Sequence, residues 1–461
     1  MSGPVPLSDA WERVVTVREA GELEQELVVR LGRASRVRSV GVTDLLSLRP
    51  AYYRAILPPV PIPPERQARL DQGRAFHRAL GARIGRDAIL EARVRREGLV
   101  GRIDVLSELP VEVKTATLLT DPEQLASRRP DHVEQLGMYC ALVGRLTGRL
   151  LTLLAEETSV ADVQAVDLTF RSLDRILAEM HRRADALREA WTEASPARLP
   201  RCPWYDRGCE FGAARLCDCT GEEPPTPPEI LEQAGPAVPN AEVRSRIRSA
   251  LSGPILPASG ITLERFRDAL YPRRAFFERA RPEPPPIIVP TPPVPPPVSL
   301  TPDLYARLTD ALESGAAGEV ARLVPRAEEP EEEVAGFRGR PLLLRTSRAW
   351  SRFRPEELLT RSPQYALELG LRCAVTGTDT GLLVVGFERA VTDRERIQVL
   401  EVRFRSLTPF SRWLRERSRS LGTALRDDTP EGLTPCPEWM VSDCPYRSEC
   451  GCPGPGPRVT R

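Results

Sequence analysis

The ten cysteines of the chain fall into two sets of five that repeat one pattern along the sequence. Subtracting the positions of the first set from those of the second gives offsets of 233, 234, 235, 233 and 233. Five matched offsets make an internal duplication far likelier than coincidence, so we expect the fold to contain a repeated unit. The two sets are Cys140, Cys202, Cys209, Cys217 and Cys219, then Cys373, Cys436, Cys444, Cys450 and Cys452.

Other segments repeat together with the cysteines. "LGMYCALVG" (136–144) matches "LGLRCAVTG" (369–377), and "PVEVKT" (110–115) falls on "PLLLRT" (341–346). A proline-dense stretch between the copies predicts a semi-rigid connector. We therefore expect a helical lead-in over residues 1–37, a first domain over 38–222, a linker over 223–240, a second domain over 241–453 and a tail over 454–461.

Length and composition fit a protein without a membrane-spanning segment. A chain of 461 residues favours two or three domains. No apolar run reaches the length that a bilayer crossing requires, and the start "MSGPVPLSDAWERV" lacks the layout of a signal peptide. These features predict a cytoplasmic protein with no membrane partner. The net charge of +1 excludes a global basic field for nucleic acid, although local arginine clusters occur.

Lys114 is the only lysine in the chain, and the other 64 of the 65 basic residues are arginine. It lies two residues after Glu112 in "LPVEVKTATL". Apolar residues alternate through residues 97–118, which predicts a β-hairpin with Glu112 and Lys114 on one face of a strand. Asp104 joins that face if a three-residue loop over 107–109 places it opposite Glu112. We predict this odd register.

Two carboxylates that converge across a hairpin form an oxygen-ligand site suited to Mg²⁺ or Mn²⁺. A lysine beside them adds a compact positive charge, which a planar and bulky guanidinium does not reproduce. The alternative interpretation is a surface strand whose Glu112 and Lys114 face solvent. The retention of a single lysine in an arginine-only chain favours the metal site.

Helices and a further strand surround the hairpin in the sequence. Helical spacing of apolar residues around Phe76 and Leu80 predicts a helix in the segment 63–94. Residues 131–146 return to helical spacing, residues 148–157 are typical of a buried strand, and residues 171–194 predict a long amphipathic helix. This mixture predicts an α/β domain.

The ordered set of motifs resembles the PD-(D/E)xK nuclease superfamily. Asp104 followed by Glu112-x-Lys114 is similar to the core of that superfamily. "GRAFH" (73–77) resembles the G-x(3)-H helix of its RecB-type branch, and "QLGMY" (135–139) resembles the Q-x(3)-Y helix of the same branch. A cysteine cluster follows the core, as in iron–sulfur members such as AddB and the nuclease of CRISPR adaptation. The resemblance covers roughly residues 40–220.

The resemblance implies a fold and a role for each matched residue. The fold would be a restriction-endonuclease-like core, a central mixed sheet flanked by helices, in two tandem copies that each end in a four-cysteine, metal-bound segment. The metal ligands would be His77, Asp104 and Glu112, with the Val113 carbonyl as a fourth. Lys114 would orient and activate the attacking water. Gln135 and Tyr139, at i and i+4 on one helix face, would hold the DNA backbone or the catalytic shell.

Each copy ends in four closely spaced cysteines that fit either a tetrahedral zinc ion or a [4Fe–4S] cluster. The resemblance favours [4Fe–4S] and allows two clusters. Iron–sulfur members take one ligand from before the core, but residues 46–53 contain no cysteine. The cluster is therefore expected to clamp a C-terminal subdomain rather than to join the two ends of the copy. Cys140 and Cys373 are predicted to be packing thiols. The proposed cluster ligands are Cys202, Cys209, Cys217 and Cys219, then Cys436, Cys444, Cys450 and Cys452.

The second copy lacks the residues of the metal site. We find no counterpart to Asp104, and no histidine follows His181. The second copy is therefore predicted to be inactive and to serve scaffolding, DNA binding or a protein partner. Aligned on the cysteines, Glu112, Lys114, Gln135 and Tyr139 become Leu343, Arg345, Glu368 and Arg372.

These observations predict a metal-dependent deoxyribonuclease. By analogy it would be an exonuclease that acts on single-stranded or end-containing DNA in repair, recombination or defence. Two alternatives stay open. One is a non-catalytic DNA-binding or assembly subunit stabilised by two iron–sulfur or zinc clusters, and the other is a zinc-stabilised adaptor without DNA contact.

Overall fold

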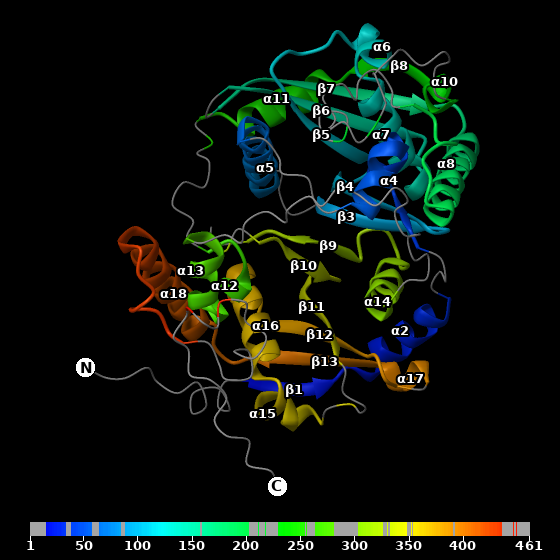
Figure 1. Ribbon diagram of the computed structural model, residues 1–461. Coiled ribbons are helices and arrows are strands. Elements are labelled where there is room, and N and C mark those ends of the chain that lie inside the picture. The colour runs from blue at the N-terminus through cyan, green and yellow to red at the C-terminus, as the bar shows by residue number, and fades with distance from the viewer. Residues whose placement is uncertain are drawn as a thin grey trace. The chain divides into compact units, whose positions relative to one another are not determined.

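Mixed β-sheet flanked by α-helices forms the framework of the chain in the computed structural model (Figure 1). This agrees with the predicted α/β class. Within the described part of the chain, no helix has both the length and the apolar character needed to cross a membrane. The structure describes residues 15–33, 38–57, 64–83, 88–156, 159–201, 211, 217, 229–253, 255, 263–280, 303–325, 330, 332–347, 352, 354–390, 392–435, 446 and 449.

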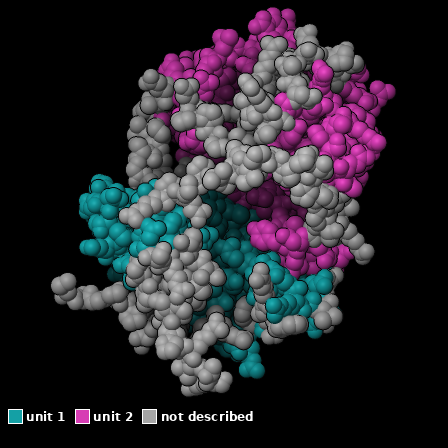
Figure 2. Space-filling model, in the orientation of Figure 1, with its two compact units in different colours: residues 1–28, 258–290, 323–461 teal, residues 29–257, 291–322 magenta. Residues whose placement is uncertain are grey.

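The chain divides into two compact units that are not continuous in sequence (Figure 2). Unit 1 comprises residues 1–28, 258–290 and 323–461, and unit 2 comprises residues 29–257 and 291–322. This division differs from the predicted domains 38–222 and 241–453.

The predicted linker also differs from the structure. Residues 229–239 form helix α10 and strand β8, and β8 pairs antiparallel with β7 in unit 2. Two features of the segment explain the difference. Its prolines are tolerated because β8 has a neighbour on one side only within the unit, and Ile230 of α10 is fully buried.

In unit 2 the hydrogen-bonded strand order is β3-β4-β5-β6-β7-β8, with β5 and β6 parallel and the remaining neighbours antiparallel. Residues 320 and 322 of β9 pair with β3, and β2 pairs parallel with β4. Helix α7 makes the crossover between the parallel strands. The elements are β2 (Val40–Gly41), α3 (Val42–Leu46), α4 (Leu48–Ile56), α5 (Pro64–Arg83), β3 (Ile89–Arg96), β4 (Leu99–Leu106), β5 (Pro110–Ala116), η1 (Pro122–Gln124), α6 (Leu125–Arg128), α7 (Pro130–Val143), β6 (Thr147–Ala155), β7 (Val160–Phe170), α8 (Leu173–Glu193), α10 (Glu229–Gln233), β8 (Ala234–Pro239), α11 (Ala241–Ala250), α14 (Leu304–Glu313) and β9 (Val320–Leu323).

The predicted helix over 63–94 is only partly correct. Helix α5 ends at Arg83, and the chain then forms strand β3 from Ile89. Leu90, Ala92 and Val94 are buried at a spacing of two, which is the period of a strand and not of a helix. A short apolar run of this kind is ambiguous by spacing alone.

The hairpin register is confirmed. Val105 pairs with Val111 and Leu106 with Pro110, so the loop contains three residues. Extending this register by one pair places Asp104 opposite Glu112. The two carboxylates therefore belong to neighbouring strands on one side of the hairpin.

Helix α7 is fixed closely against the sheet. It begins with Pro130 in its first turn and ends at Gly144, whose φ of +72° lies in the left-handed region that suits glycine. Gly148 of β6 faces the helix, and a Cβ there would lie 2.7 Å from the Cys140 sulfur. The missing side chain lets α7 approach β6. This approach positions the residues that α7 contributes to the site.

In unit 1 the strand order is β1-β13-β12-β11-β10, with β11 and β12 parallel and the other neighbours antiparallel. Strand β1 pairs with β13, so the predicted lead-in over 1–37 is not wholly helical. The elements are β1 (Val15–Glu19), α2 (Gly21–Arg33, which continues into unit 2), α12 (Phe266–Leu270), α13 (Pro272–Ala280), β10 (Val334–Phe337), β11 (Arg340–Ser347), η3 (Pro355–Glu357), α15 (Leu358–Arg361), α16 (Pro363–Thr376), β12 (Thr380–Phe387), α17 (Asp393–Arg396), β13 (Ile397–Phe404) and α18 (Thr408–Asp427).

The close approach of helix and strand recurs in unit 1. Gly381 of β12 faces α16, and a Cβ there would lie 2.7 Å from Leu369 and 3.0 Å from the Cys373 sulfur. Cys140 and Cys373 are both fully buried, which confirms the prediction that they are packing thiols. Burial raises the pKa of Cys140 to about 12, so its thiol stays protonated at neutral pH.

Candidate active site

The β4–β5 hairpin and helix α5 bring an imidazole and a carboxylate together in unit 2. The Asp104 Oδ2 accepts a hydrogen bond of 2.7 Å from the Val113 backbone N–H. The Nδ1 of His77 lies 4.0 Å from the Asp104 Oδ1. The backbone of Val113, whose carbonyl was predicted to bind the metal, therefore also fixes the Asp104 carboxylate through its N–H. The role of the Val113 carbonyl stays a prediction.

A continuous chain of polar contacts runs from the hairpin to helix α7. The Lys114 Nζ lies 2.6 Å from the Glu112 Oε1 and donates to the Gln135 Oε1 at 2.8 Å. The Gln135 Nε2 then donates to the Tyr139 Oη at 3.0 Å. Gln135 is only 6% exposed and Tyr139 only 3%. Their burial favours a role in holding the catalytic shell over direct contact with a DNA backbone.

Glu91 of β3 is the site residue that sequence analysis missed. Ligand atoms of His77, Glu91 and Asp104 all lie within 4.8 Å of one another. Glu91 has a φ of +48°, a left-handed conformation that is uncommon for glutamate, and its Oε2 lies 2.8 Å from the Arg102 Nε. A strand beginning near Ile89 was the signal that could have found it, because Glu91 then lies opposite Asp104 between the pairs Leu90–Val105 and Ala92–Ile103.

Glu112 lies outside that three-residue group but interacts electrostatically with two of its members, Asp104 and His77. Its Oε2 is buried and has no hydrogen-bond partner within the described part of the chain. A buried carboxylate oxygen without a donor is costly unless a cation or a proton satisfies it. The residues present therefore fit a divalent cation: three potential ligands, one imidazole and two carboxylates, are close together, and a third carboxylate, that of Glu112, has an unsatisfied oxygen.

The crowding of buried carboxylates shifts their protonation. Burial raises the pKa of Glu112 to about 7, and the Asp104 charge adds to the effect. Burial also raises the pKa of Asp104 to about 6, against the hydrogen bond from Val113. Burial lowers the pKa of His77, so its imidazole is neutral at neutral pH and retains a lone pair for a metal.

The cation of Lys114 is retained in this setting. Burial acts to lower the pKa of Lys114, but the charges of Glu112 and Asp104 outweigh burial and raise the pKa above its ordinary value. Burial, followed by the Glu112 charge, raises the pKa of Tyr139 well above its ordinary value. Without a bound metal, the site thus holds an ammonium and a neutral phenol, so Lys114 is a hydrogen-bond donor rather than a base.

Most cysteines of the two clusters lie outside the described residues, namely Cys202, Cys209, Cys219, Cys436, Cys444, Cys450 and Cys452. Cys217 is described and is buried. Neither the ligand sets nor the [4Fe–4S] or zinc assignment is therefore tested.

Described residues next to the cysteines contact helix α4 in unit 2 and helix α13 in unit 1. In unit 2, Arg49 of α4 donates to the Leu199 carbonyl at 3.2 Å, and Tyr53 stacks on Phe211 with ring centroids 5.5 Å apart. These contacts join the cysteine-bearing segment to helix α4 near the start of unit 2. The prediction was that the cysteine segment binds a C-terminal subdomain only. The structure shows that residues beside the cysteines also contact helix α4.

Unit 1 repeats this attachment. Arg273 of α13 donates to the Leu433 carbonyl at 3.0 Å, and Phe277 stacks on Tyr446 with ring centroids 5.6 Å apart. An arginine and an aromatic side chain four residues apart on one helix therefore hold the cysteine-bearing segment in both units.

The equivalent hairpin position in unit 1 is apolar. Gly336 pairs with Pro341 and Phe337 with Arg340, so the same register places Val334 opposite Leu343. Both side chains are 1% exposed and belong to the hydrophobic core of unit 1. The two positions that carry Asp104 and Glu112 in unit 2 thus hold no oxygen ligand.

The remaining polar positions of unit 1 form an ion-pair network. The Glu368 carboxylate pairs with Arg345 and, at 3.0 Å, with Arg372. Arg372 also lies 2.6 Å from Glu332 and stacks over the Phe266 ring at 4.7 Å. These charges neutralise one another and leave unit 1 without the carboxylate cluster of unit 2.

Comparisons with known proteins do not identify a family. No family model matches the chain, and no curated protein matches it. A solved structure titled "Crystal structure of SSO0001" is 17% identical, with a TM-score of 0.28, and the match covers 43% of this chain and 96% of that one. A TM-score this low carries no argument about fold or function.

Proposed function

We propose that unit 2 is a metal-dependent deoxyribonuclease of the RecB-type PD-(D/E)xK class and that unit 1 is a degenerate, inactive copy of it. The observation that carries the proposal is the convergence of His77, Asp104, Glu112 and Lys114 on one hairpin face and its neighbouring helix. The lone lysine of the chain lies at the centre of this cluster.

The duplication is supported by contacts as well as by sequence. Both units join two parallel strands through a helix that packs its cysteine against a strand glycine. The glycines Gly148 and Gly381 are 233 residues apart, as are Cys140 and Cys373. A conserved spacing between contacting residues is the pattern that two copies of one fold would leave.

A divalent cation such as Mg²⁺ or Mn²⁺ would be held by His77, Asp104 and Glu112, and Glu91 adds a fourth candidate ligand. When bound, it would supply Lewis-acid stabilisation of charge on the scissile phosphate. His77 is suited to this because its imidazole is neutral. Burial is the main cause of the raised pKa values of Asp104 and Glu112, and a bound cation would favour their charged forms.

In the proposed reaction, water adds to the phosphorus, one P–O ester bond breaks, and the leaving alkoxide takes a proton. The Lys114 ammonium would orient the water and stabilise negative charge as the bond to phosphorus forms. Gln135 fixes the direction of the ammonium, and Tyr139 in turn fixes Gln135. By analogy alone, the substrate would be a single-stranded DNA end in repair, recombination or defence.

The two cysteine segments are proposed to bind [4Fe–4S] clusters, with zinc as the alternative. Iron, sulfide and zinc analysis of protein purified without oxygen separates the two. Cys217, buried among the described residues, is consistent with a ligand that is screened from solvent.

A Lys114→Ala variant tests the enzyme. We expect Mn²⁺- or Mg²⁺-dependent cleavage of end-labelled DNA to fall by about 10²- to 10⁴-fold, because the ammonium that orients the water and stabilises negative charge is lost. The matched control is Arg345→Ala, which removes the equivalent cation of unit 1 and should leave cleavage unchanged. Equal cleavage by wild type and Lys114→Ala would instead support the non-catalytic DNA-binding or assembly subunit. A buried Lys114–Glu112 ion pair at 2.6 Å would then serve stability alone.

A further inference from the structure

Helix α18 of unit 1 has a straight row of arginines on its exposed side. Arg412, Arg415, Arg419 and Arg426 are all exposed, and at 100° per residue they fall within roughly 60° of one another around the helix axis. The buried residues of the helix, which include Leu414 and Leu421, lie on the opposite side. We call these four arginines the α18 row. From Arg412 to Arg426 it extends about 21 Å.

No carboxylate neutralises the α18 row within the described residues. The contacts of its members are to neutral groups: the Arg415 Nε donates to the Ser411 carbonyl at 3.2 Å, and the Arg426 guanidinium to the Thr423 hydroxyl at 3.2 Å. Glu416 is the only acidic residue between the first and last arginine of the row. The helix as a whole carries five arginines against two acidic residues, a net charge of +3.

The corresponding helix of unit 2 lacks such a row. Helix α8 carries four arginines against five acidic residues, a net charge of −1. Three of its arginines are paired: Arg182 and Arg183 with Glu179, and Arg188 with Asp185, at 2.6 to 2.9 Å. The same helix of the duplicated fold is thus neutralised in one copy and strongly cationic in the other. Exposure to solvent alone does not explain why α18 carries a net charge of +3 and α8 a net charge of −1.

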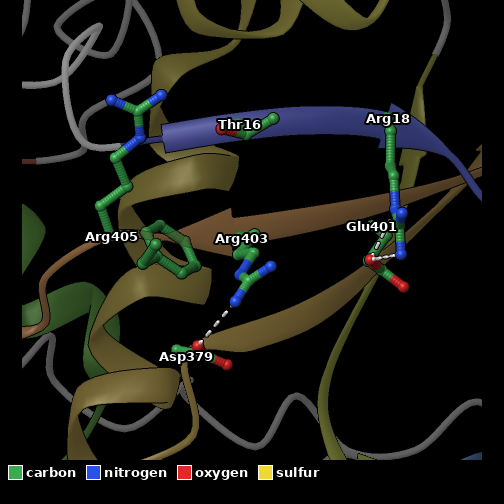
Figure 3. Close-up of a pocket in the computed structure, with 7 residues that line it drawn as sticks. Thr16, Arg18, Asp379, Glu401, Arg403 and Arg405 are labelled. Carbon is green, nitrogen blue, oxygen red and sulfur yellow. Dashed lines mark hydrogen bonds and ion pairs between the residues drawn. The ribbon is translucent and has the colours of Figure 1, made fainter.

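A second cationic feature lies directly before α18 in the chain. A cavity of about 460 Å³ opens beside the end of β13, and Arg403 and Arg405 line it (Figure 3). Arg403 lies 3.8 Å from Asp379, and Arg18 pairs with Glu401. The Arg405 guanidinium is directed away from both carboxylates (Figure 3). Arg405 precedes the first residue of α18 by three positions, a chain length of about 10 Å at most.

We infer that the α18 row and Arg405 bind the phosphate backbone of single-stranded DNA, which makes the inactive copy a DNA-holding surface. A line of guanidinium groups that have no carboxylate partner among the described residues matches a line of phosphates in charge and in shape, because each fork can contact two phosphate oxygens. The choice of DNA as the polyanion rests on the proposed function. The inference that unit 1 binds a polyanion rests on the charge and exposure of the α18 row and Arg405.

The test is fluorescence anisotropy of a labelled oligothymidylate with the full-length protein in EDTA, so that no cleavage occurs. The variant is the triple change Arg412→Ala, Arg415→Ala and Arg419→Ala. Loss of three phosphate contacts should raise the Kd about 100-fold at about 0.1 M salt and make the slope of log Kobs against log salt less negative by about 2. The charge-matched control is Arg145→Ala, Arg171→Ala and Arg175→Ala, three exposed arginines of unit 2 that make no ion pair with a described residue.

Wild-type affinity and salt slope in the row variant would overturn the inference. Equal weakening by both triple variants would also overturn it, because binding would then report net charge alone. Loss of binding to anionic lipid vesicles with unchanged oligothymidylate binding would assign the row to a membrane surface instead. Failure of the proposed function is a separate result, since Lys114→Ala tests cleavage and the row variants test binding without metal.

Discussion

The two units share one framework but fill the same hairpin position in opposite ways. Unit 2 places Asp104 and Glu112 opposite each other, beside an ammonium. Unit 1 places Val334 opposite Leu343 and joins its remaining charges in a closed network around Glu368. Unit 1 thus has apolar packing and paired charges at these positions, whereas unit 2 has buried carboxylates that burial and mutual repulsion drive toward protonation.

This difference separates stability from function. A buried carboxylate oxygen that accepts no hydrogen bond from the described residues, such as the Oε2 of Glu112, destabilises the fold unless a ligand satisfies it. Such local conflicts are expected at functional sites. Three experiments test the contrast between the two units, and the largest expected effect comes first.

The first experiment exchanges the cations of the two units. Lys114→Arg should lower metal-dependent DNA cleavage by about 100-fold or more, because a planar guanidinium cannot reproduce the short contacts of Nζ to Glu112 and Gln135. The reverse change, Arg345→Lys, should leave cleavage unchanged. Both rates are measured on end-labelled DNA at saturating Mn²⁺.

Cleavage at the wild-type rate by Lys114→Arg would show that any cation suffices at this position. Function would then not explain why position 114 holds the only lysine of the chain. Circular dichroism of both variants shows whether a change in rate reflects loss of the fold.

The second experiment measures stability against pH in EDTA. Folding raises the pKa of Glu112 from 4.5 to about 7 and that of Asp104 from 3.8 to about 6. The folded state then binds more protons than the unfolded state, so the free energy of unfolding should fall as pH rises from about 4 to about 7. Glu112 alone accounts for a loss of about 3 kcal/mol by this reasoning.

Urea unfolding across this pH range measures the loss. Glu112→Gln should remove much of the slope, because an amide does not ionise, and Mn²⁺ should stabilise the protein more at the upper end of the range than at the lower end. A slope that Glu112→Gln leaves intact would assign the pH dependence to other groups.

The third experiment opens the network of unit 1. Glu368→Gln removes the charge that Arg345 and Arg372 share, and it should destabilise the protein by about 2 kcal/mol while cleavage persists. Its counterpart in unit 2, Gln135→Ala, should cost less than about 1 kcal/mol of stability but lower cleavage, because the Lys114 ammonium loses its second acceptor. Urea unfolding and the cleavage assay measure the two effects. A drop in cleavage for Glu368→Gln without unfolding would contradict the assignment of unit 1 as inactive.

Local pattern was enough to predict the centre of the site. The period of two in the hairpin gave the face shared by Glu112 and Lys114, and the odd loop placed Asp104 opposite Glu112. Glu91 was missed for a physical reason. It lies just after a helix-to-strand change, in a run whose apolar spacing fits either state, and in a backbone conformation that no propensity favours for glutamate.

Non-local pairing was beyond the reach of sequence patterns. The division into units depends on contacts such as β1 with β13, which join residues nearly 400 positions apart. The edge strand β8 was hidden because proline density suggested a connector, although one-sided pairing leaves room for proline. The cysteine offsets were enough to align Arg345, Glu368 and Arg372 with residues of the first set. They could not predict that these three side chains form ion pairs with one another.

The pairing of β1 with β13 also bears on how the chain is made. Val15 emerges from the ribosome early, whereas its partner Phe404 follows 389 residues later, roughly 20 to 80 seconds at usual synthesis rates. During that interval β1 carries backbone donors and acceptors with no strand to meet them. Completion of the unit 1 sheet is therefore a late event that follows translation of almost the entire polypeptide.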